Sequence, residues 1–138
     1  MIVWGGRDGQ VLDTGGRLTP GVDTWEPTAT GGLCPSPRFG HTAVWTGTEM
    51  VVWGGLIPGG GGYVRLATGG KYSPVADTWQ ATSTSPGCPL ARAAHSATWT
   101  GTEMVVWGGV SDTGARLNTG GRYEPGSDTW LPTSTAGA

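Results

Sequence analysis

Two histidines, each preceded closely by an arginine, are the residues of this chain best suited to chemistry. His41 follows Arg38 by three residues, and His95 follows Arg92 by the same number. Imidazole serves as a metal ligand or as a general acid and base near neutral pH. A metal site would need further histidine, carboxylate or thiolate ligands at suitable spacing, and none accompanies this pair. We therefore predict no metal and no cofactor, and expect both histidines to be hydrogen-bonding core residues, with a metal or catalytic role as the alternative.

The two arginines have the donors for either a structural or a binding role. A guanidinium group carries five N–H donors in a fixed plane. This geometry suits an arginine that ties loop carbonyls together, or one that pairs with a repeated acid such as Glu49 or Glu103. The functional alternative is a ring of arginines, Arg38 and Arg92, that binds an acidic ligand.

The cysteines Cys34 and Cys88 also occupy equivalent positions, each four residues before one of these arginines. A disulfide requires Cα atoms within about 7 Å, which successive repeat units seldom provide. We therefore favour an interchain bridge or two free thiols over a bond between them. Neither cysteine has a histidine and an acid beside it in sequence, so neither is predicted to be a nucleophile.

These residues recur because the chain is built from successive copies of a repeat of about fifty residues. Each copy has an apolar segment that ends in Gly-Gly, a second Gly-Gly after threonine, and then Asp-Thr-Trp. The glycine pairs and tryptophans are Gly5, Gly6, Gly54, Gly55, Gly108 and Gly109, with Trp25, Trp79 and Trp130. Repeat length varies mainly in residues 7–13, 56–67 and 110–118, where insertions are tolerated and binding residues are usually carried. Such units are stable only when they stack on one another.

The composition indicates an all-β protein. Charged residues make up only 13% of the chain, and no apolar pattern at helical spacing runs for ten residues. The formal charge of −2 and the single lysine, Lys71, provide no basic face, so we expect no nucleic-acid partner. No apolar run approaches the roughly 20 residues of a membrane helix, and we expect no membrane association.

Strands are predicted at Phe39–Thr46, Met50–Trp53, Gly69–Ser73 and Thr78–Thr82, and the unit recurs from Ala94, with its first strand at Ala94–Thr100. The segment from Met50 to Trp53 is apolar at every position, which is typical of a strand buried on both faces. The glycine-rich residues 58–65 do not open a helix, so we expect a flexible insertion rather than a phosphate-binding loop.

The order of these motifs resembles the kelch repeat, which forms one blade of a β-propeller. The family's signature falls on Arg38, Arg92, His41, His95, Tyr72, Tyr123 and the glycine pairs and tryptophans named above. Leu18 replaces the aromatic residue in the first unit. The resemblance implies four-stranded blades whose first strand is innermost. It also implies that the loops joining the second and third strands, and those joining successive blades, share a face that often carries the ligand.

We therefore predict a single all-β domain, residues 1–138, that forms a partial kelch propeller of about three four-stranded antiparallel blades. The blades are expected at 1–33, 34–87 and 88–138, with eleven strands and no inner strand in the first. Kelch propellers usually close with six or seven blades. We thus expect either a fragment of a longer propeller or a protomer that closes a ring with copies of itself, most simply a homodimer of six blades, with an open polymer as the alternative. The missing strand would be a gap or would be filled by another segment.

The predicted function is a non-catalytic scaffold that binds a protein or a glycan through the shared loop face. The candidate ligand-face residues are Arg7, Asp8, Arg38, Phe39, Leu56, Tyr63, Arg65, Arg92, Val110, Asp112 and Arg116. The alternative is a fragment of a copper enzyme resembling galactose oxidase, for which the chain offers only Tyr63, Tyr72 and Tyr123. Localisation is undetermined. The low charge, the single lysine and the abundant threonine, glycine and tryptophan resemble secreted or cell-surface bacterial kelch proteins, which favours an extracellular or cell-surface location, although no export signal precedes the first strand.

Overall fold

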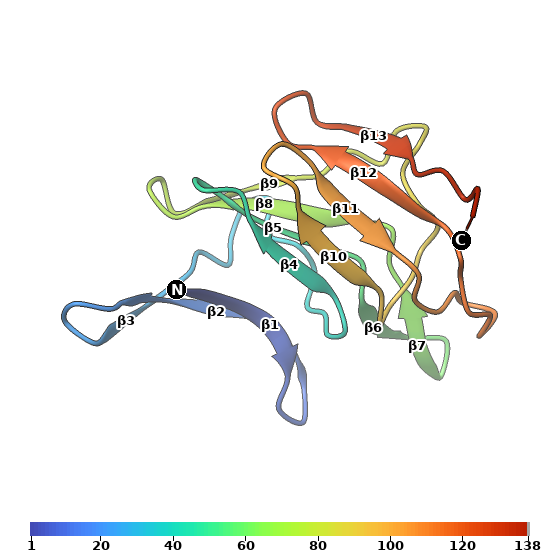
Figure 1. The fold of residues 1–138 in the computed structure, drawn as a ribbon. Helices are drawn as coiled ribbons and strands as arrows, with labels where there is room; N and C mark the ends of the chain where they lie inside the picture. The colour runs from blue at the N-terminus through green and yellow to red at the C-terminus, as the bar shows by residue number, and fades with distance from the viewer. Residues whose placement is uncertain (138) are drawn as a thin grey trace.

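The computed structural model describes residues 1–137, and every regular element in that range is a β-strand (Figure 1). Thirteen strands within this range form three antiparallel sheets and one separate hairpin. No helix in the described part of the chain is long and apolar enough to span a membrane. The predicted all-β architecture of antiparallel blades is confirmed.

The first sheet has three strands, in the order β1 (Ile2–Arg7), β2 (Val11–Thr19) and β3 (Thr24–Pro27). The register between β1 and β2 shifts between Trp4 and Gly6. Gly5 and Gly6 adopt φ values of 68° and 107° at this irregularity, a conformation that disfavours any residue with a Cβ. The free edge of β1 has no paired strand among the described residues.

The second and third sheets each contain four strands and share one topology. The second sheet has the order β4 (Thr42–Trp45), β5 (Met50–Trp53), β8 (Gly69–Ser73) and β9 (Thr78–Ala81). The third sheet has the order β10 (Ser96–Trp99), β11 (Met104–Trp107), β12 (Gly120–Glu124) and β13 (Thr129–Pro132). The first sheet therefore has counterparts of every strand except β4 and β10.

The inner strands begin later than the sequence predicts. Phe39 forms an isolated bridge to Leu56 instead of belonging to β4. Gly40 and Ala94 have φ values of 64° and 54°, and this left-handed conformation interrupts the extended backbone just before the two inner strands. This conformation confines β4 and β10 to four residues each.

The glycine-rich insertion forms a hairpin and not an irregular loop. β6 (Leu56–Gly59) pairs with β7 (Gly62–Arg65), and Gly60 and Gly61 connect them with φ values of 60° and 79°. A two-residue turn with positive φ at both positions matches the twist of an antiparallel pair, and it favours glycine at both. The hairpin projects from the second sheet at its lower end in Figure 1.

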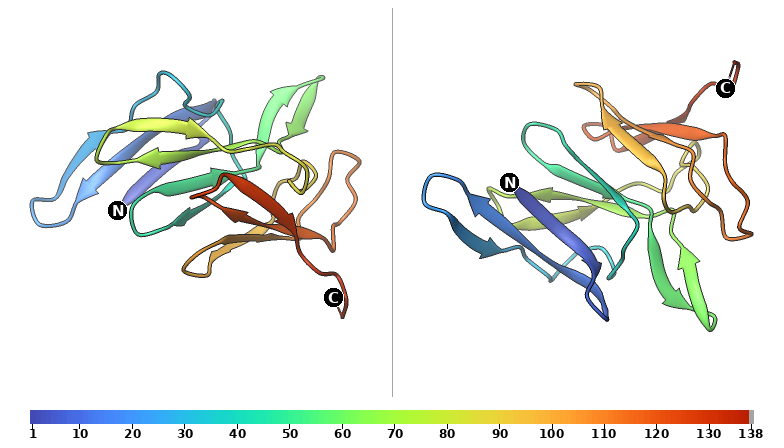
Figure 2. Two further views of the ribbon diagram at one scale, coloured as in Figure 1. Left: turned by 90° about the horizontal axis from the view of Figure 1, so that it is seen from above. Right: turned by 60° about the horizontal axis from the view of Figure 1, so that its bottom comes forward.

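The core lies between the sheets, which follow one another side by side with the second in the middle (Figure 2). One apolar cluster between the first and second sheets contains Trp4, Met50, Val52, Tyr72 and Trp79. A second cluster between the second and third sheets contains Val44, Val51, Trp53, Met104, Val106, Tyr123 and Trp130. Successive residues of β5 thus contribute to opposite clusters, and all four are at most 4% exposed. The predicted burial of Met50–Trp53 on both faces is confirmed.

Candidate functional site

Three side chains from separate segments of the chain, β1, β7 and the residues before β4, meet at one end of the stack. The guanidinium carbon of Arg7, at the end of β1, lies 5.8 Å from the ring centroid of Phe39 and 5.6 Å from that of Tyr63. The two rings contact each other edge to face, with centroids 5.0 Å apart. We call these three residues the arginine–aromatic cluster. A cation this close to aromatic faces is attracted by their quadrupoles.

Backbone hydrogen bonds hold the cluster in place. The N–H of Phe39 donates to the carbonyl of Leu56 at 3.2 Å, and the N–H of Leu56 donates back to the carbonyl of Phe39 at 2.8 Å. This bridge fixes the segment before β4 against the start of β6. The β6–β7 register then places Tyr63 opposite Pro58, next to Phe39. The hairpin therefore positions one of the two aromatic rings.

The cluster borders a shallow cavity of about 390 Å³. Its walls are formed by Arg7, Gly9, Gln10, Val11, Pro37, Ile57, Pro58 and Tyr63. Arg7 is exposed, and the ion pairs found among residues 1–137 are Arg17–Glu26 and Arg122–Glu103. The charge of Arg7 is therefore free to meet a ligand group beside an apolar wall.

The remaining candidates lie in two places, the β7 end with the loop after β11 and the turn between β1 and β2. The backbone N–H of Arg65 donates to Asp112 Oδ1 at 2.8 Å, which joins β7 to the loop after β11. In that loop Val110 and Arg116 face each other as an isolated bridge. Asp8 occupies the turn between β1 and β2, where its carboxylate accepts the N–H of Gln10 at 3.4 Å.

Arg38 and Arg92 are placed differently from a solvent-facing arginine ring, because each is only 1% exposed. Arg38 donates to the carbonyls of Gly54 and Thr68 at 3.1 and 2.7 Å. Arg92 donates to the equivalent carbonyls of Gly108 and Thr119 at 2.9 and 2.6 Å. Burial lowers the pKa of Arg38 to about 10, which leaves the group charged at neutral pH. These donors are taken up by the chain itself, and neither arginine pairs with Glu49 or Glu103.

The histidines lie between sheets. His95 Nε2 is 2.8 Å from Thr42 Oγ1, so the ring connects the third sheet to the inner strand of the second. His41 packs edge-on against Trp4, with ring centroids 5.5 Å apart. Burial, reinforced by Arg38 for His41 and by Arg92 for His95, lowers both pKa values to about 4. Both imidazoles are therefore neutral near pH 7.

The residues that a copper site would require do not come together. Tyr72 and Tyr123 are buried in different sheets, and their hydroxyls donate to Asp77 and Asp128 respectively. Tyr63 stands apart on the β6–β7 hairpin. Cys34 and Cys88 are unbonded to each other, and their thiols contact the carbonyls of Asp13 and Ala67. Burial raises the pKa of both thiols, which disfavours the thiolate. This arrangement does not fit the copper chemistry considered above.

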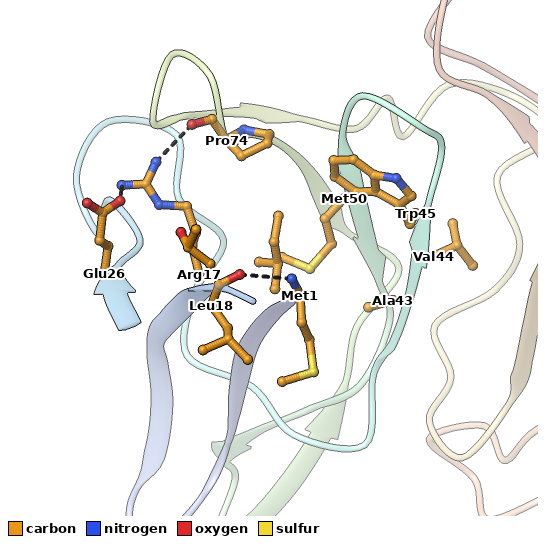
Figure 3. Close-up of a pocket in the computed structure, with 11 residues that line it drawn as sticks. Met1, Arg17, Leu18, Glu26, Ala43, Val44, Trp45, Met50 and Pro74 are labelled. Atoms are coloured by element: carbon orange, nitrogen blue, oxygen red, sulfur yellow. Dashed lines mark hydrogen bonds and ion pairs between the residues drawn. The ribbon is translucent and has the colours of Figure 1, made fainter. Parts of the chain in front are cut away.

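A larger groove of about 760 Å³ is lined by residues of both the first and the second sheet (Figure 3). Met1 and Ile2 line one side, and Val44, Trp45 and Met50 line the other. The strands β4 and β10 contact each other in the neighbouring pair of sheets. The groove thus lies beside the free edge of β1, where a counterpart of those inner strands would be expected.

Stacked four-stranded antiparallel sheets, joined by loops that meet on one face, define the class of β-propeller repeat proteins. More particularly, the chain belongs to the KLHDC2/KLHL20/DRC7 Kelch-repeats domain family, which matches residues 1–138.

Host cell factor 1 of Rattus norvegicus and of Homo sapiens is 35% identical over 99 residues, or 67% of this chain. Host cell factor of Drosophila melanogaster is 26% identical over 128 residues, or 79% of the chain. The match covers only 5% of the two mammalian proteins and 8% of the insect protein. The resemblance to the kelch repeat is confirmed.

Proposed function

We propose that this kelch domain is a non-catalytic scaffold that binds another protein through the arginine–aromatic cluster. The observation that supports this function is the contact of an exposed, unpaired Arg7 with Phe39 and Tyr63, which come from different segments of the chain. Arginine and large aromatic residues contribute most of the binding energy in protein interfaces. Kelch-repeat domains are typically protein-binding scaffolds, which agrees with this assignment.

The chemistry of the cluster favours a particular kind of partner segment. The guanidinium of Arg7 can donate two parallel hydrogen bonds to a carboxylate. The adjoining cavity has Val11, Ile57 and Pro58 in its wall, which suits an apolar side chain next to that carboxylate. The expected ligand is therefore an exposed peptide segment in which an acidic residue neighbours an apolar one.

Selection from a phage-displayed random peptide library on the immobilised domain tests this function. Peptides of the stated composition should be enriched, and Arg7→Ala or Tyr63→Ala should weaken their binding at least tenfold, as expected for central interface residues. Val75→Ala is the matched control, because Val75 is 95% exposed in the turn between β8 and β9. Enriched peptides whose affinity is unchanged in Arg7→Ala and Tyr63→Ala would contradict the assignment.

Glycan binding is the second candidate. Tyr63 is 41% exposed and could stack on a sugar ring. A glycan array should then show binding that is lost in Tyr63→Ala and kept in Val75→Ala. A glycan array that shows no binding would contradict the glycan candidate and leave a protein as the proposed ligand.

We also infer that the domain self-assembles, most simply as a homodimer of six blades. Trp25 of the first sheet is 51% exposed, whereas its counterparts Trp79 and Trp130 are 4% and 2% exposed. Large exposed apolar residues on an otherwise repeated interface favour association. Light scattering coupled to size exclusion should report twice the 14.1 kDa chain mass at micromolar concentration. A species of single-chain mass at all concentrations would contradict self-assembly.

A further inference from the structure

The packing between neighbouring sheets is repeated almost identically within this chain. The second sheet packs Trp79 against Trp4 of the first, with ring centroids 5.1 Å apart. The third sheet packs Trp130 against Trp53 of the second at 5.2 Å. One apolar contact geometry therefore serves two successive interfaces.

The hydrogen bonds between neighbouring sheets also repeat, and the same two tryptophans, Trp79 and Trp130, take part in them. Trp79 Nε1 donates to the carbonyl of Ala29 at 2.9 Å, and Trp130 Nε1 donates to that of Ser83 at 3.0 Å. In return, the N–H groups of Ala29 and Ser83 donate to Asp77 and Asp128, both at 2.9 Å. Each interface thus contains a reciprocal pair of hydrogen bonds between an Asp-Thr-Trp motif and the loop of the preceding sheet.

A third polar contact connects the outer strands of neighbouring sheets. Arg17 Nη1 donates to the carbonyl of Pro74 at 2.8 Å, and Lys71 Nζ donates to that of Pro125 at 3.0 Å. The cationic residue that follows the second Gly-Gly of one sheet therefore donates to the turn between the two outer strands of the next sheet. Arg122 is the equivalent cation of the third sheet, and Pro20 is the equivalent proline of the first.

The first sheet presents this interface without a partner among the described residues. We call Met1, Val3, Asp23 and Trp25 the front flank. Met1, Val3 and Trp25 are 64%, 48% and 51% exposed, whereas their counterparts in the other two sheets are at most 4% exposed. Asp23 has a φ of 51°, against 52° and 53° for Asp77 and Asp128, so its motif already has the backbone conformation of the bonded copies.

The third sheet presents the complementary surface. We call Val105, Trp107, Arg122 and Ser134 the rear flank, because they are equivalent to Val51, Trp53, Lys71 and Ser83. Val51 and Trp53 are fully buried, whereas Val105 and Trp107 are partly exposed. The Arg122 side chain is 43% exposed. Both halves of the repeated interface are thus carried by one chain.

Building on the self-assembly inferred above, we propose that the front flank of one copy binds the rear flank of a second copy. Trp25 packs on Trp107 of the partner subunit and donates to the carbonyl of Ser134 of the partner subunit. Asp23 accepts the N–H of that serine, and Arg122 of the partner subunit donates to the carbonyl of Pro20. The contact is head to tail, and a ring of two copies contains two equal interfaces of this kind.

Mixing two variants tests this contact. Trp25→Asp damages only the front flank and Val105→Asp only the rear, so each chain alone should run at single-chain mass. An equimolar mixture should recover a two-chain species, because one undamaged front flank meets one undamaged rear flank. Val75→Asp, outside both flanks, should assemble like the unaltered chain. If Val105→Asp fails to fold, as judged by circular dichroism, Arg122→Glu takes its place.

The outcomes separate this contact from self-assembly itself. An unaltered chain that assembles while Trp25→Asp and Val105→Asp assemble equally well would overturn the flank contact and leave self-assembly intact. Folded variants that stay monomeric even when mixed would overturn the head-to-tail geometry. An unaltered chain that is monomeric at every concentration would overturn both and leave a different segment as the partner of the flanks.

Discussion

Arg92 acts where two strands of the third sheet stop pairing. The carbonyls of Gly108 and Thr119 lie just beyond β11 and just before β12, and both accept a hydrogen bond from one guanidinium nitrogen of Arg92. A third bond from Arg92 Nε reaches the carbonyl of Leu90 at 3.0 Å. The arginine thereby supplies a donor to the half-buried carbonyl of Gly108 and a second donor to that of Thr119, which also accepts the N–H of Gly108 at 3.0 Å. Carbonyls that lose such donors away from water are costly.

Replacing Arg92 by lysine should destabilise the domain by about 2 to 4 kcal/mol, because one ammonium cannot reproduce the planar fork that reaches the carbonyls of Leu90, Gly108 and Thr119 together. The free energy of unfolding, measured by urea titration with circular dichroism, provides the test. Arg116→Lys is the control and should change stability by less than about 1 kcal/mol, because Arg116 is exposed and lies outside both flanks. A loss below about 1 kcal/mol in Arg92→Lys would contradict this role.

At the same scale, the sequence identifies side chains but not their contacts. Arg7, Phe39 and Tyr63 are each recognisable from the sequence as candidates for the ligand face. Their contact with one another is not, because it depends on the bridge between Phe39 and Leu56. From the sequence alone, Arg38 and Arg92 are equally suited to binding a ligand and to donating to backbone carbonyls. The choice depends on where the neighbouring strands end, which only the fold shows. The recurrence of Asp-Thr-Trp signals a shared role, but the acceptors on the preceding sheet are visible only in the fold.

At the scale of elements, patterning predicts the strands that stack and misses the hairpin that projects. Met50–Trp53 and Gly69–Ser73 are found at their predicted bounds, because buried strands carry strong apolar and glycine signals. The β6–β7 hairpin is short and has a proline at Pro58, which weakens a strand signal. The adjacent glycines Gly60 and Gly61 carry the turn signal that could have revealed it.

The glycine pairs allow a matched test of how tightly the elements approach each other. Gly54 and Gly108 both have a φ of 72°. A Cβ on Gly54 would lie 2.6 Å from His95 Cε1 and 3.0 Å from the Arg92 carbonyl, whereas one on Gly108 would meet only the Leu117 carbonyl at 3.6 Å. Gly108→Ala should therefore lose about 1 to 2 kcal/mol from backbone strain alone.

Gly54→Ala should lose a further 1 to 3 kcal/mol, roughly, because the His95 ring must move within a packed interface. Thermal or urea unfolding of the two variants side by side measures the difference. Equal losses in the two variants would show that the strain dominates and that the second and third sheets are not in close contact at Gly54.

At the scale of the whole molecule, stability depends on contacts between successive sheets. Repeat arrays derive their stability from the units and from nearest-neighbour interfaces, with no contacts between distant units. His95 sits in one such interface, between Thr42 and Trp53, and His41 sits in the other, beside Trp4. A change that charges these rings acts on both interfaces at once.

Acid should therefore loosen the stack between pH 6.5 and pH 4. The folded pKa of each histidine is about 4, below the unfolded value of roughly 6.5, so the unfolded chain binds more protons in this window and stability falls as pH falls. At pH 5 the loss should be about 1 to 2 kcal/mol per histidine, allowing for partial solvent access. Below pH 4 both states are protonated and this contribution is fully lost. The hydrogen bond that the Tyr72 hydroxyl donates lowers the pKa of Asp77, so the Asp77 carboxyl titrates below this pH window.

Urea unfolding at pH 7 and pH 5 measures the effect, and His95→Gln supplies the comparison because glutamine can still hydrogen-bond Thr42 but does not titrate. The variant should lose about half of the pH dependence, since His41 remains. Stability that is equal at both pH values in the unaltered chain would contradict neutral, buried imidazoles. A variant with the full pH dependence would instead assign the titration to groups outside the interface between the second and third sheets.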